Sequence, residues 1–237
     1  MQGHDQTPYL LRLVPYSAAA ANEAAALVQA LQGTEGKLGA YLDWFRYGAD
    51  QLGILAEFVE GPTVQQLIDA QAPPALRPLL ESGLEALREL HTRGWTHGDI
   101  KPCNLIVRPD GRLMLVDVAL PSYSQPPHSC AHSSIATPRY MAPEALSALI
   151  DGLPLPAAQA QAADLWSLGI ALWELAAQRM PYADAIQRAD IYRAMAAPLQ
   201  PSPGDLDPVL GRMLRLEPAE RQTAADLLAL LRANPVV

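Results

Sequence analysis

The chain has 237 residues, of which half are hydrophobic and 18% are charged, so we expect a globular protein with a sizeable core. Its net charge of −8 argues against nucleic acid as the main partner, because phosphate backbones are held by clustered Lys and Arg. The two cysteines are too few for a disulfide framework or a zinc cluster. The first residues are polar, and the most apolar stretch, 165–177, is too short to span a bilayer. We therefore expect a cytoplasmic protein without a membrane partner.

The first sixty residues alternate between strand and helix signals. An alanine-rich helix is expected over Ala18–Gln32, because a glycine follows and stops it. The Gly-Pro pair at 61–62 breaks the chain at the end of this region. The predicted strands are the apolar runs on either side of the helix: Tyr9–Pro15, Ala40–Tyr47 and Leu52–Val59.

After residue 62 the pattern is mostly helical, with one predicted β-hairpin. Leu105–Val107 and Leu113–Val116 flank a Pro-Asp-Gly turn. Residues 117–140 are rich in Pro and Ser and are expected to form an exposed loop. The predicted helices are segments with apolar residues at helical spacing: Val64–Ala70, Leu76–Arg93, Asp164–Gln178, Ala185–Ala196, Pro208–Leu216 and Ala224–Ala233.

The most informative segment runs from His97 to Asn104 (HGDIKPCN). It holds a carboxylate, Asp99, an amine two residues later, Lys101, and an amide five residues later. On a loop between a helix and a hairpin these groups suit phosphoryl transfer, since the carboxylate can accept a hydroxyl proton, the amine can neutralise the phosphoryl group, and the amide oxygen can bind Mg²⁺. A second metal ligand is expected on the hairpin, and Asp117 lies where its second strand ends.

This segment resembles the catalytic loop of Ser/Thr protein kinases, whose pattern is H-R-D-x-K-x-x-N, and Asp117 begins a segment similar to the family's D-F-G. Other kinase motifs occur before and after this segment, in the family's order. They resemble the hinge (EFVEG, 57–61), the end of the activation segment (TPRYMAPE, 137–144), the start of a buried helix (DLWSLG, 164–169) and the ERQTA segment that holds Arg221.

The resemblance implies an α+β, two-lobed fold in a single kinase-like domain over residues 1–237. A reduced N-lobe would cover 1–60, and a mainly helical C-lobe would cover 61–237. The implied cofactors are ATP and Mg²⁺. Asp99 would deprotonate the acceptor hydroxyl and Lys101 would contact the phosphoryl group, while Asn104 and Asp117 would hold the metal.

The resemblance also implies roles outside the catalytic loop. Backbone groups of Glu57 and Val59 would receive the adenine. Thr137 would brace the catalytic aspartate together with Lys101, a pair seen in kinases that act on Ser or Thr. Two further features are expected to be structural: an ion pair of Glu144 with Arg221, and Asp164 as an anchor for the catalytic loop.

The sequence also departs from the family's pattern. Only eight residues precede Tyr9, so we expect the Gly-rich phosphate loop to be missing. Arg12 stands where the family has a strand lysine that contacts phosphates, and Glu23 is the expected helix partner of Arg12. Gly98 replaces the arginine of H-R-D, so phosphorylation of the activation segment is not expected to switch this protein on. Val and Ala replace Phe and Gly after Asp117.

Three functions remain open from the sequence. The first is an atypical protein serine/threonine kinase that uses MgATP. The second is a non-enzymatic pseudokinase scaffold that binds a partner protein, which the missing loop favours and the intact Asp99, Lys101, Asn104 and Asp117 oppose. The third is a small-molecule kinase, which the activation-segment motif disfavours because that motif shapes a groove for a polypeptide. For Arg12, a solvated strand residue and a phosphate contact are equally good interpretations.

Overall fold

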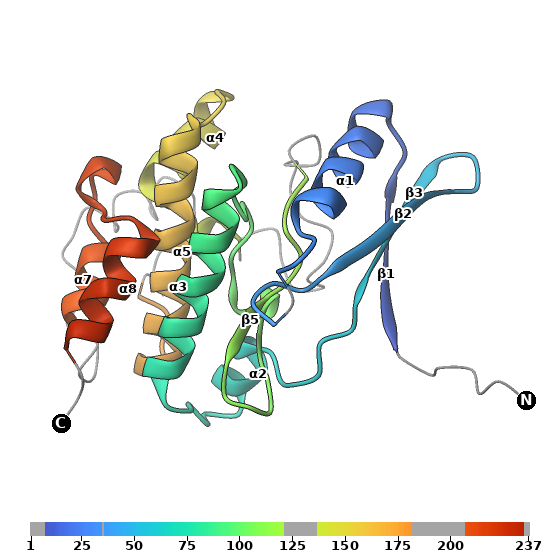
Figure 1. Cartoon of the computed structure of the whole chain (residues 1–237). Coiled ribbons are helices and arrows are strands. Elements are labelled where there is room, and N and C mark those ends of the chain that lie inside the picture. Colours follow the sequence, from blue (N-terminus) through green and yellow to red (C-terminus); the bar gives the residue numbers. More distant parts are fainter. Residues whose placement is uncertain (1–7, 35, 121–136, 182–206, 235–237) are drawn as a thin grey trace, which may run out of the picture.

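The computed structural model describes residues 8–34, 36–120, 137–181 and 207–234, and they form two lobes (Figure 1). The N-lobe is a three-stranded antiparallel sheet with one helix. Its strands are β1 (Tyr9–Pro15), β2 (Tyr41–Tyr47) and β3 (Gln51–Glu57), in the spatial order β1-β3-β2, and the helix α1 (Ala18–Ala30) follows β1. The sheet therefore has its last strand in sequence at its centre.

Helix α1 packs on the inner face of this sheet. It begins where the Oγ of Ser17 accepts a hydrogen bond from the N–H of Ala20 at 3.0 Å. The small buried side chains of Ala20 and Ala24 let the helix approach the sheet closely, and Leu27 and Ile54 are fully buried between them. This packing fixes the position of the face of β1 that carries the predicted phosphate contact.

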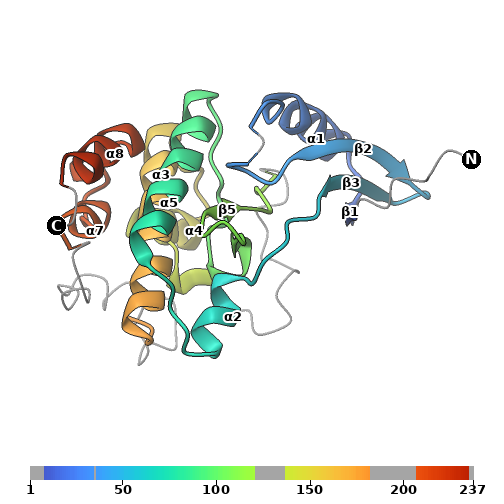
Figure 2. The ribbon, with the colours of Figure 1, turned by 60° about the horizontal axis from the view of Figure 1, so that its bottom comes forward.

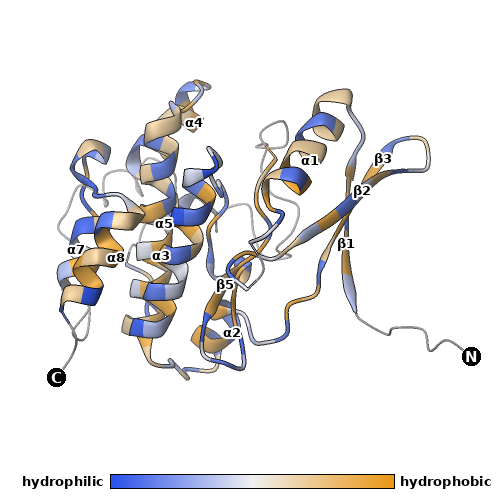
Figure 3. Cartoon of the chain, in the orientation of Figure 1, coloured by the Kyte–Doolittle hydropathy of each residue, from blue (hydrophilic) through white to orange (hydrophobic). Residues whose placement is uncertain are grey.

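The C-lobe is mainly helical and is built around α5 (Ala157–Ala177), as Figure 2 shows. Helix α3 (Leu76–Thr92) contacts α5 through a row of buried leucines. Figure 3 shows that hydrophilic and apolar residues alternate along α3. A short hairpin lies against α3. The remaining elements are α2 (Val64–Asp69), β4 (Leu105–Val107), β5 (Leu113–Leu115), α4 (Pro143–Asp151), α7 (Asp207–Met213) and α8 (Ala224–Ala233).

The two lobes share one buried core. Leu38, just before β2, forms a parallel bridge with Leu115 of the hairpin, and the N–H of Gly39 donates to the carbonyl of Leu115 at 2.9 Å. Both leucines are fully buried in an apolar cluster that extends from β1 to α8. The hairpin therefore lies at the junction of the lobes, and the segment after it contacts the N-lobe through the carbonyl of Val118, to which Arg12 and Tyr41 both donate.

The predicted strands, the hairpin and most helices are confirmed, with ends shifted by a few residues. One helix was not predicted, and another was predicted too short. Helix α4 lies in a segment where no helix was predicted, although Pro143 at its first turn and Gly152 in the left-handed conformation (φ 66°) at its end are ordinary helix signals. Helix α5 begins seven residues before Asp164, because the alanine-rich segment after Pro156 is helical too.

Other predictions fall outside the described residues. The predicted helix Ala185–Ala196 and most of the predicted loop at 117–140 are among them. No helix in the described ranges is both long and apolar enough to cross a membrane.

Candidate active site

The catalytic loop lies between α3 and β4 and is held by one carboxylate from α5. Asp164 is buried, and its Oδ2 accepts the N–H of His97 at 2.7 Å while its Oδ1 accepts the N–H of Gly98 at 2.9 Å. The Nε2 of His91, near the end of α3, lies 2.9 Å from the same Oδ2. These bonds satisfy a buried charge, as burial requires. The predicted anchoring role of Asp164 is confirmed.

Gly98 has a backbone that favours glycine. Its φ is 72°, in the left-handed region, and a Cβ built on it would lie 3.3 Å from the Cβ of Ala119. An arginine here would be strained as well as crowded. The glycine that replaces the family's arginine is therefore consistent with the local geometry of this loop.

His97 holds the loop from the interior of the lobe. It is fully buried, its Nε2 donates to the carbonyl of Val116 at 3.0 Å, and its Nδ1 accepts the N–H of Asp99 at 3.4 Å. This pattern requires a neutral ring, with one nitrogen as donor and the other as acceptor. Burial lowers the pKa of His97, although the carboxylates of Asp164, Asp99 and Asp117 oppose the shift.

The structure brings the three catalytic-loop candidates together. The Nζ of Lys101 lies 2.6 Å from the Oδ2 of Asp99, and Asn104 Nδ2 donates to the same oxygen at 3.1 Å and to the Asp99 carbonyl at 2.8 Å. Lys101 is 3% exposed, whereas the side chain of Asp99 is 16% exposed. One carboxylate oxygen is thus fixed by a buried cation and an amide, and the group as a whole still reaches the surface.

Asp117 lies beside this network and has an unusual backbone. Its φ is 65°, a conformation that few residues other than glycine and the Asx residues adopt. The adjoining segment is tied to the catalytic loop, since the N–H of Ala119 donates to the carbonyl of His97 at 2.9 Å. The loop and the end of the hairpin therefore form one hydrogen-bonded unit.

Arg12 contacts Asp117 across the junction of the lobes. Its Nη1 lies 2.6 Å from Asp117 Oδ1 and donates to the carbonyl of Val118 at 3.4 Å. We expected Glu23 as the partner of Arg12, whereas the ion pair that the structure shows at this guanidinium is with Asp117.

Tyr41 completes this contact and was missed from the sequence. It is buried in β2, and its hydroxyl donates to the carbonyl of Val118 at 3.4 Å. Burial raises the pKa of Tyr41, with a further contribution from the negative charge of Asp117. A tyrosine at the start of a predicted strand carries no sequence signal for such a role, because aromatic residues are common in strands.

The predicted adenine contacts lie at the end of β3. Glu57 is the last residue of the strand, and its N–H donates to the carbonyl of Ala40 at 2.8 Å. Val59 is buried, and among the described residues no backbone hydrogen bond engages its N–H. Thr137 opens a short 3₁₀ turn, Thr137–Arg139, but its side chain lies outside the described part of the chain.

The donor chemistry of the site fits Mg²⁺. Because Asn104 uses its amide nitrogen on Asp99, its amide oxygen is the atom able to ligate a cation, and Asp117 adds a carboxylate. Hard cations of this size prefer such oxygens and take their other ligands from water and phosphates. One carboxylate oxygen of Asp117 is engaged by Arg12. The other Asp117 carboxylate oxygen and the Asn104 amide oxygen are therefore the candidate ligands among the described residues.

Two buried pairs stabilise the surrounding lobe. Arg221 binds Glu144 in a two-pronged contact at 2.5 and 2.9 Å and also donates to the carbonyls of Ala162, Arg215 and Leu216. The predicted structural pair is therefore confirmed. The second pair, from the hydroxyl of Tyr140 to Glu174 at 2.7 Å, was not predicted, and burial raises the pKa of Glu174.

Comparison with known proteins supports this picture. A model of the protein kinase domain matches residues 19–230. Among curated proteins, the chain is similar to the serine/threonine-protein kinases cds1 of Schizosaccharomyces pombe and PkaA of Streptomyces coelicolor, each 29% identical over 76% of this chain and over 41% and 34% of their own lengths. It is 30% identical to PAK 5 of Rattus norvegicus, over 76% of this chain and 25% of that protein. The chain therefore spans less than half the length of these relatives.

Proposed function

Because this chain belongs to the protein kinase family, we propose that it transfers the γ-phosphate of ATP to a serine or threonine hydroxyl of a protein. The observation that carries the proposal is the network of Asp99, Lys101 and Asn104. A buried lysine held 2.6 Å from a partly exposed carboxylate has a second interpretation, a purely structural ion pair. However, such a pair does not require the amide of Asn104 on the same oxygen or a second carboxylate beside it.

In the proposed reaction, the acceptor oxygen attacks the γ-phosphorus, the bond to the ADP oxygen breaks, and the hydroxyl proton passes to Asp99. Lys101 and Asn104 both bind Oδ2 of Asp99, so Oδ1 is the oxygen that faces an incoming hydroxyl. Lys101 would also lower the energy of the negative charge that develops on the phosphoryl oxygens. Asn104 and Asp117 would hold Mg²⁺, which would supply positive charge beside the phosphates.

The backbone at the end of β3 is proposed to hold the adenine. The N–H of Val59 is a donor that a purine nitrogen can accept, and the Glu57 carbonyl is a neighbouring acceptor. Arg12 is proposed to exchange Asp117 for the phosphates when nucleotide binds, because its guanidinium is already at the metal-binding carboxylate and matches phosphate geometry.

A second candidate function is a scaffold that binds a partner protein without transferring phosphate. One observation favours it: Arg12 neutralises Asp117, which is the carboxylate proposed to hold the metal. In a scaffold this ion pair would be a permanent structural contact rather than one that nucleotide displaces.

The test is transfer of radiolabelled γ-phosphate to a generic protein substrate by the parent chain and by Asp99→Asn. We expect the variant to lose transfer and to keep its affinity for ATP, because Asp99 acts on the acceptor and the transition state. Asp110→Asn is the matched control, since Asp110 is an exposed carboxylate in the hairpin turn. Equal transfer by Asp99→Asn and the parent would contradict the kinase function, and absence of transfer from the folded parent would favour the scaffold.

A further inference from the structure

Strand β2 has an irregular start. Tyr41 lies opposite Ala56 of β3. Asp43 lies opposite the adjacent Leu55, so three residues of β2 span two residues of β3. Such a β-bulge changes which face of the sheet a side chain occupies, because side chains otherwise alternate strictly along a strand. Without the bulge, Tyr41 would share the exposed outer face with Asp43. The bulge therefore turns Tyr41 to the inner face.

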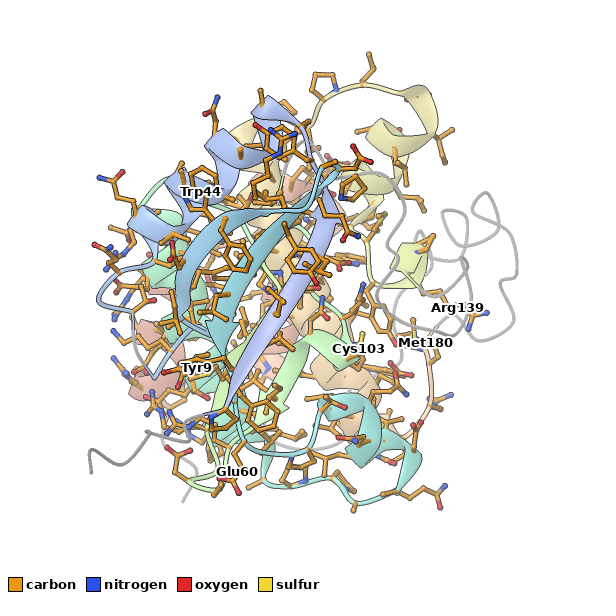
Figure 4. The ribbon with its side chains drawn as sticks, turned by 90° about the vertical axis from the view of Figure 1, so that its right-hand side faces the viewer. Tyr9, Trp44, Glu60, Cys103, Arg139 and Met180 are labelled. Atoms are coloured by element: carbon orange, nitrogen blue, oxygen red, sulfur yellow. The ribbon has the colours of Figure 1, made fainter. Side chains whose placement is uncertain are left out.

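The burial of β2 follows the bulge rather than the hydrophobicity of its residues. Tyr41 is 6% exposed, whereas the adjacent Leu42 is 44% exposed. After the bulge the inner face continues with Trp44, which Figure 4 labels and which lies opposite the fully buried Ile54. The strand therefore exposes a leucine and buries a phenol. Because a buried phenol hydroxyl usually has a hydrogen-bond partner, the partner of Tyr41 indicates what this arrangement serves.

The hydroxyl of Tyr41 contacts the peptide unit between Val118 and Ala119. It donates to the carbonyl of Val118 at 3.4 Å, and Arg12 Nη1 donates to the same oxygen at 3.4 Å. The N–H of this peptide unit, on Ala119, donates to the carbonyl of His97 at 2.9 Å. Because a peptide unit is planar and rigid, the N-lobe holds one end of it and the catalytic loop holds the other.

We propose that Tyr41 is a positioning residue that keeps the Asp117 carboxylate in place after Arg12 has moved to the phosphates of bound nucleotide. The inference rests on the proposed function, in which Arg12 exchanges Asp117 for these phosphates. Tyr41 is then the donor that the described part of the N-lobe still offers to the Val118 carbonyl. Both contacts to this carbonyl are long for hydrogen bonds. The contact from Tyr41 can shorten once Arg12 no longer competes for the oxygen.

Two features of the chain create the need for such a restraint. Asp117 has a φ of 65°, in the left-handed region that residues other than glycine seldom adopt and that persists only where the surroundings enforce it. The next residue, Val118, stands where the family has phenylalanine, so the segment has a smaller side chain for packing. A hydrogen bond to the backbone replaces part of that hold. Burial raises the pKa of Tyr41, so its hydroxyl keeps the proton that it donates.

The first experiment follows the Ala119 amide proton by NMR in the nucleotide-free chain. Tyr41→Phe keeps the ring and removes the hydroxyl, and Arg12→Met removes the competing guanidinium. Each single variant leaves one donor for the Val118 carbonyl, so we expect the amide resonance to stay close to its parent position. In the double variant neither donor remains. We expect the resonance to move toward the position of an amide without a hydrogen bond, by more than the two single shifts together.

Tyr140→Phe, alone and combined with Arg12→Met, is the matched control. Tyr140 is also buried, but its hydroxyl donates to Glu174 in the C-lobe, so it should add no movement of the Ala119 resonance in either background. A double Tyr41 and Arg12 variant with the parent's Ala119 resonance would overturn the proposal. Resonances that move throughout α1, α3 and α5 would also overturn it, because they would indicate a general structural role.

The second experiment links this position to the proposed reaction. In a chain that transfers phosphate, Tyr41→Phe should raise the Mg²⁺ concentration for half-maximal transfer about fivefold, as expected for the loss of one hydrogen bond. The effect on the rate at saturating Mg²⁺ should be much smaller. An unchanged Mg²⁺ requirement would overturn the positioning role alone. A folded parent without transfer would contradict the proposed function, and the NMR result would still decide whether Tyr41 holds this segment.

Discussion

Asp117 binds the guanidinium of Arg12, and the same carboxylate is the proposed metal ligand. The contact with Arg12 joins side chains that are 28% and 20% exposed, so solvent screens it and its strength is modest. If Asp117 holds the metal as proposed, Arg12 competes with the cation for this carboxylate in the nucleotide-free chain. The proposed kinase requires this contact to open, whereas the scaffold would keep it closed.

Arg12→Met tests the competition directly. It removes the charge and keeps most of the length of the side chain, so we expect Mn²⁺, used as a spectroscopic substitute for Mg²⁺, to bind the nucleotide-free chain about fivefold more tightly, equivalent to about 1 kcal/mol. Arg46→Met is the matched control, because Arg46 lies over the Tyr16 ring in the same sheet and away from Asp117. Unchanged Mn²⁺ affinity in Arg12→Met, measured by electron paramagnetic resonance, would show that the guanidinium does not compete.

His97 should make the stability of the fold depend on pH. Its pKa is lowered in the folded chain by burial, so the unfolded chain binds the proton more readily. Stability is then fully present above the unfolded pKa of about 6.5 and is lost as pH falls through that value toward the folded pKa, with a slope of at most about 1.4 kcal/mol per pH unit. Urea unfolding between pH 7.5 and 5 measures this slope. His97→Asn should be less stable and should show a flatter profile.

At the scale of elements, the ion pair of Arg221 with Glu144 joins the start of α4 to the turn before α8. Arg221→Ala should lower the free energy of unfolding by about 3–5 kcal/mol, because the carboxylate of Glu144 would remain buried without its cation. Arg232→Ala is the comparison: this arginine pairs with Glu81 on the surface, so its melting temperature should match that of the parent. Equal melting temperatures for both variants would contradict a structural role for the buried pair.

The sequence predicted elements better than it predicted their contacts. The strands, the hairpin and α3 follow from short-range patterns, and the catalytic loop follows from spacing within eight residues. The start of α5 was misplaced because alanine carries almost no amphipathic signal, even though its helix propensity is high. The partner of Arg12 could not be found, because its pairing with Asp117 spans 105 positions of sequence and depends on how the lobes meet. The hydrogen bond between Tyr140 and Glu174 could not be predicted either, because Glu174 lies in an apolar run that gives no signal for its partner.

At the scale of the whole molecule, the shared core predicts that the lobes unfold together. Leu38 and Leu115 bridge them within one apolar cluster, so neither lobe buries its apolar surface alone. Thermal melting followed by far-UV and near-UV circular dichroism should give coincident transitions. Leu38→Ala should lower stability by about 2–5 kcal/mol and separate the two curves. Two separated transitions in the parent would show that the lobes are independent.

The hydrogen bonds that Asp164 accepts should also slow hydrogen exchange in the catalytic loop. The amide hydrogens of residues 97 and 98 end on a buried carboxylate of α5, a helix whose residues 162–166 are all buried. Exchange of these two hydrogens with deuterated water requires the loop to leave Asp164, which would strand a charge in the core. They should therefore exchange as slowly as the amides of α5 itself, near the rate of global unfolding. Loop amides usually exchange faster than helix amides, but these two should exchange as slowly as those of a buried helix.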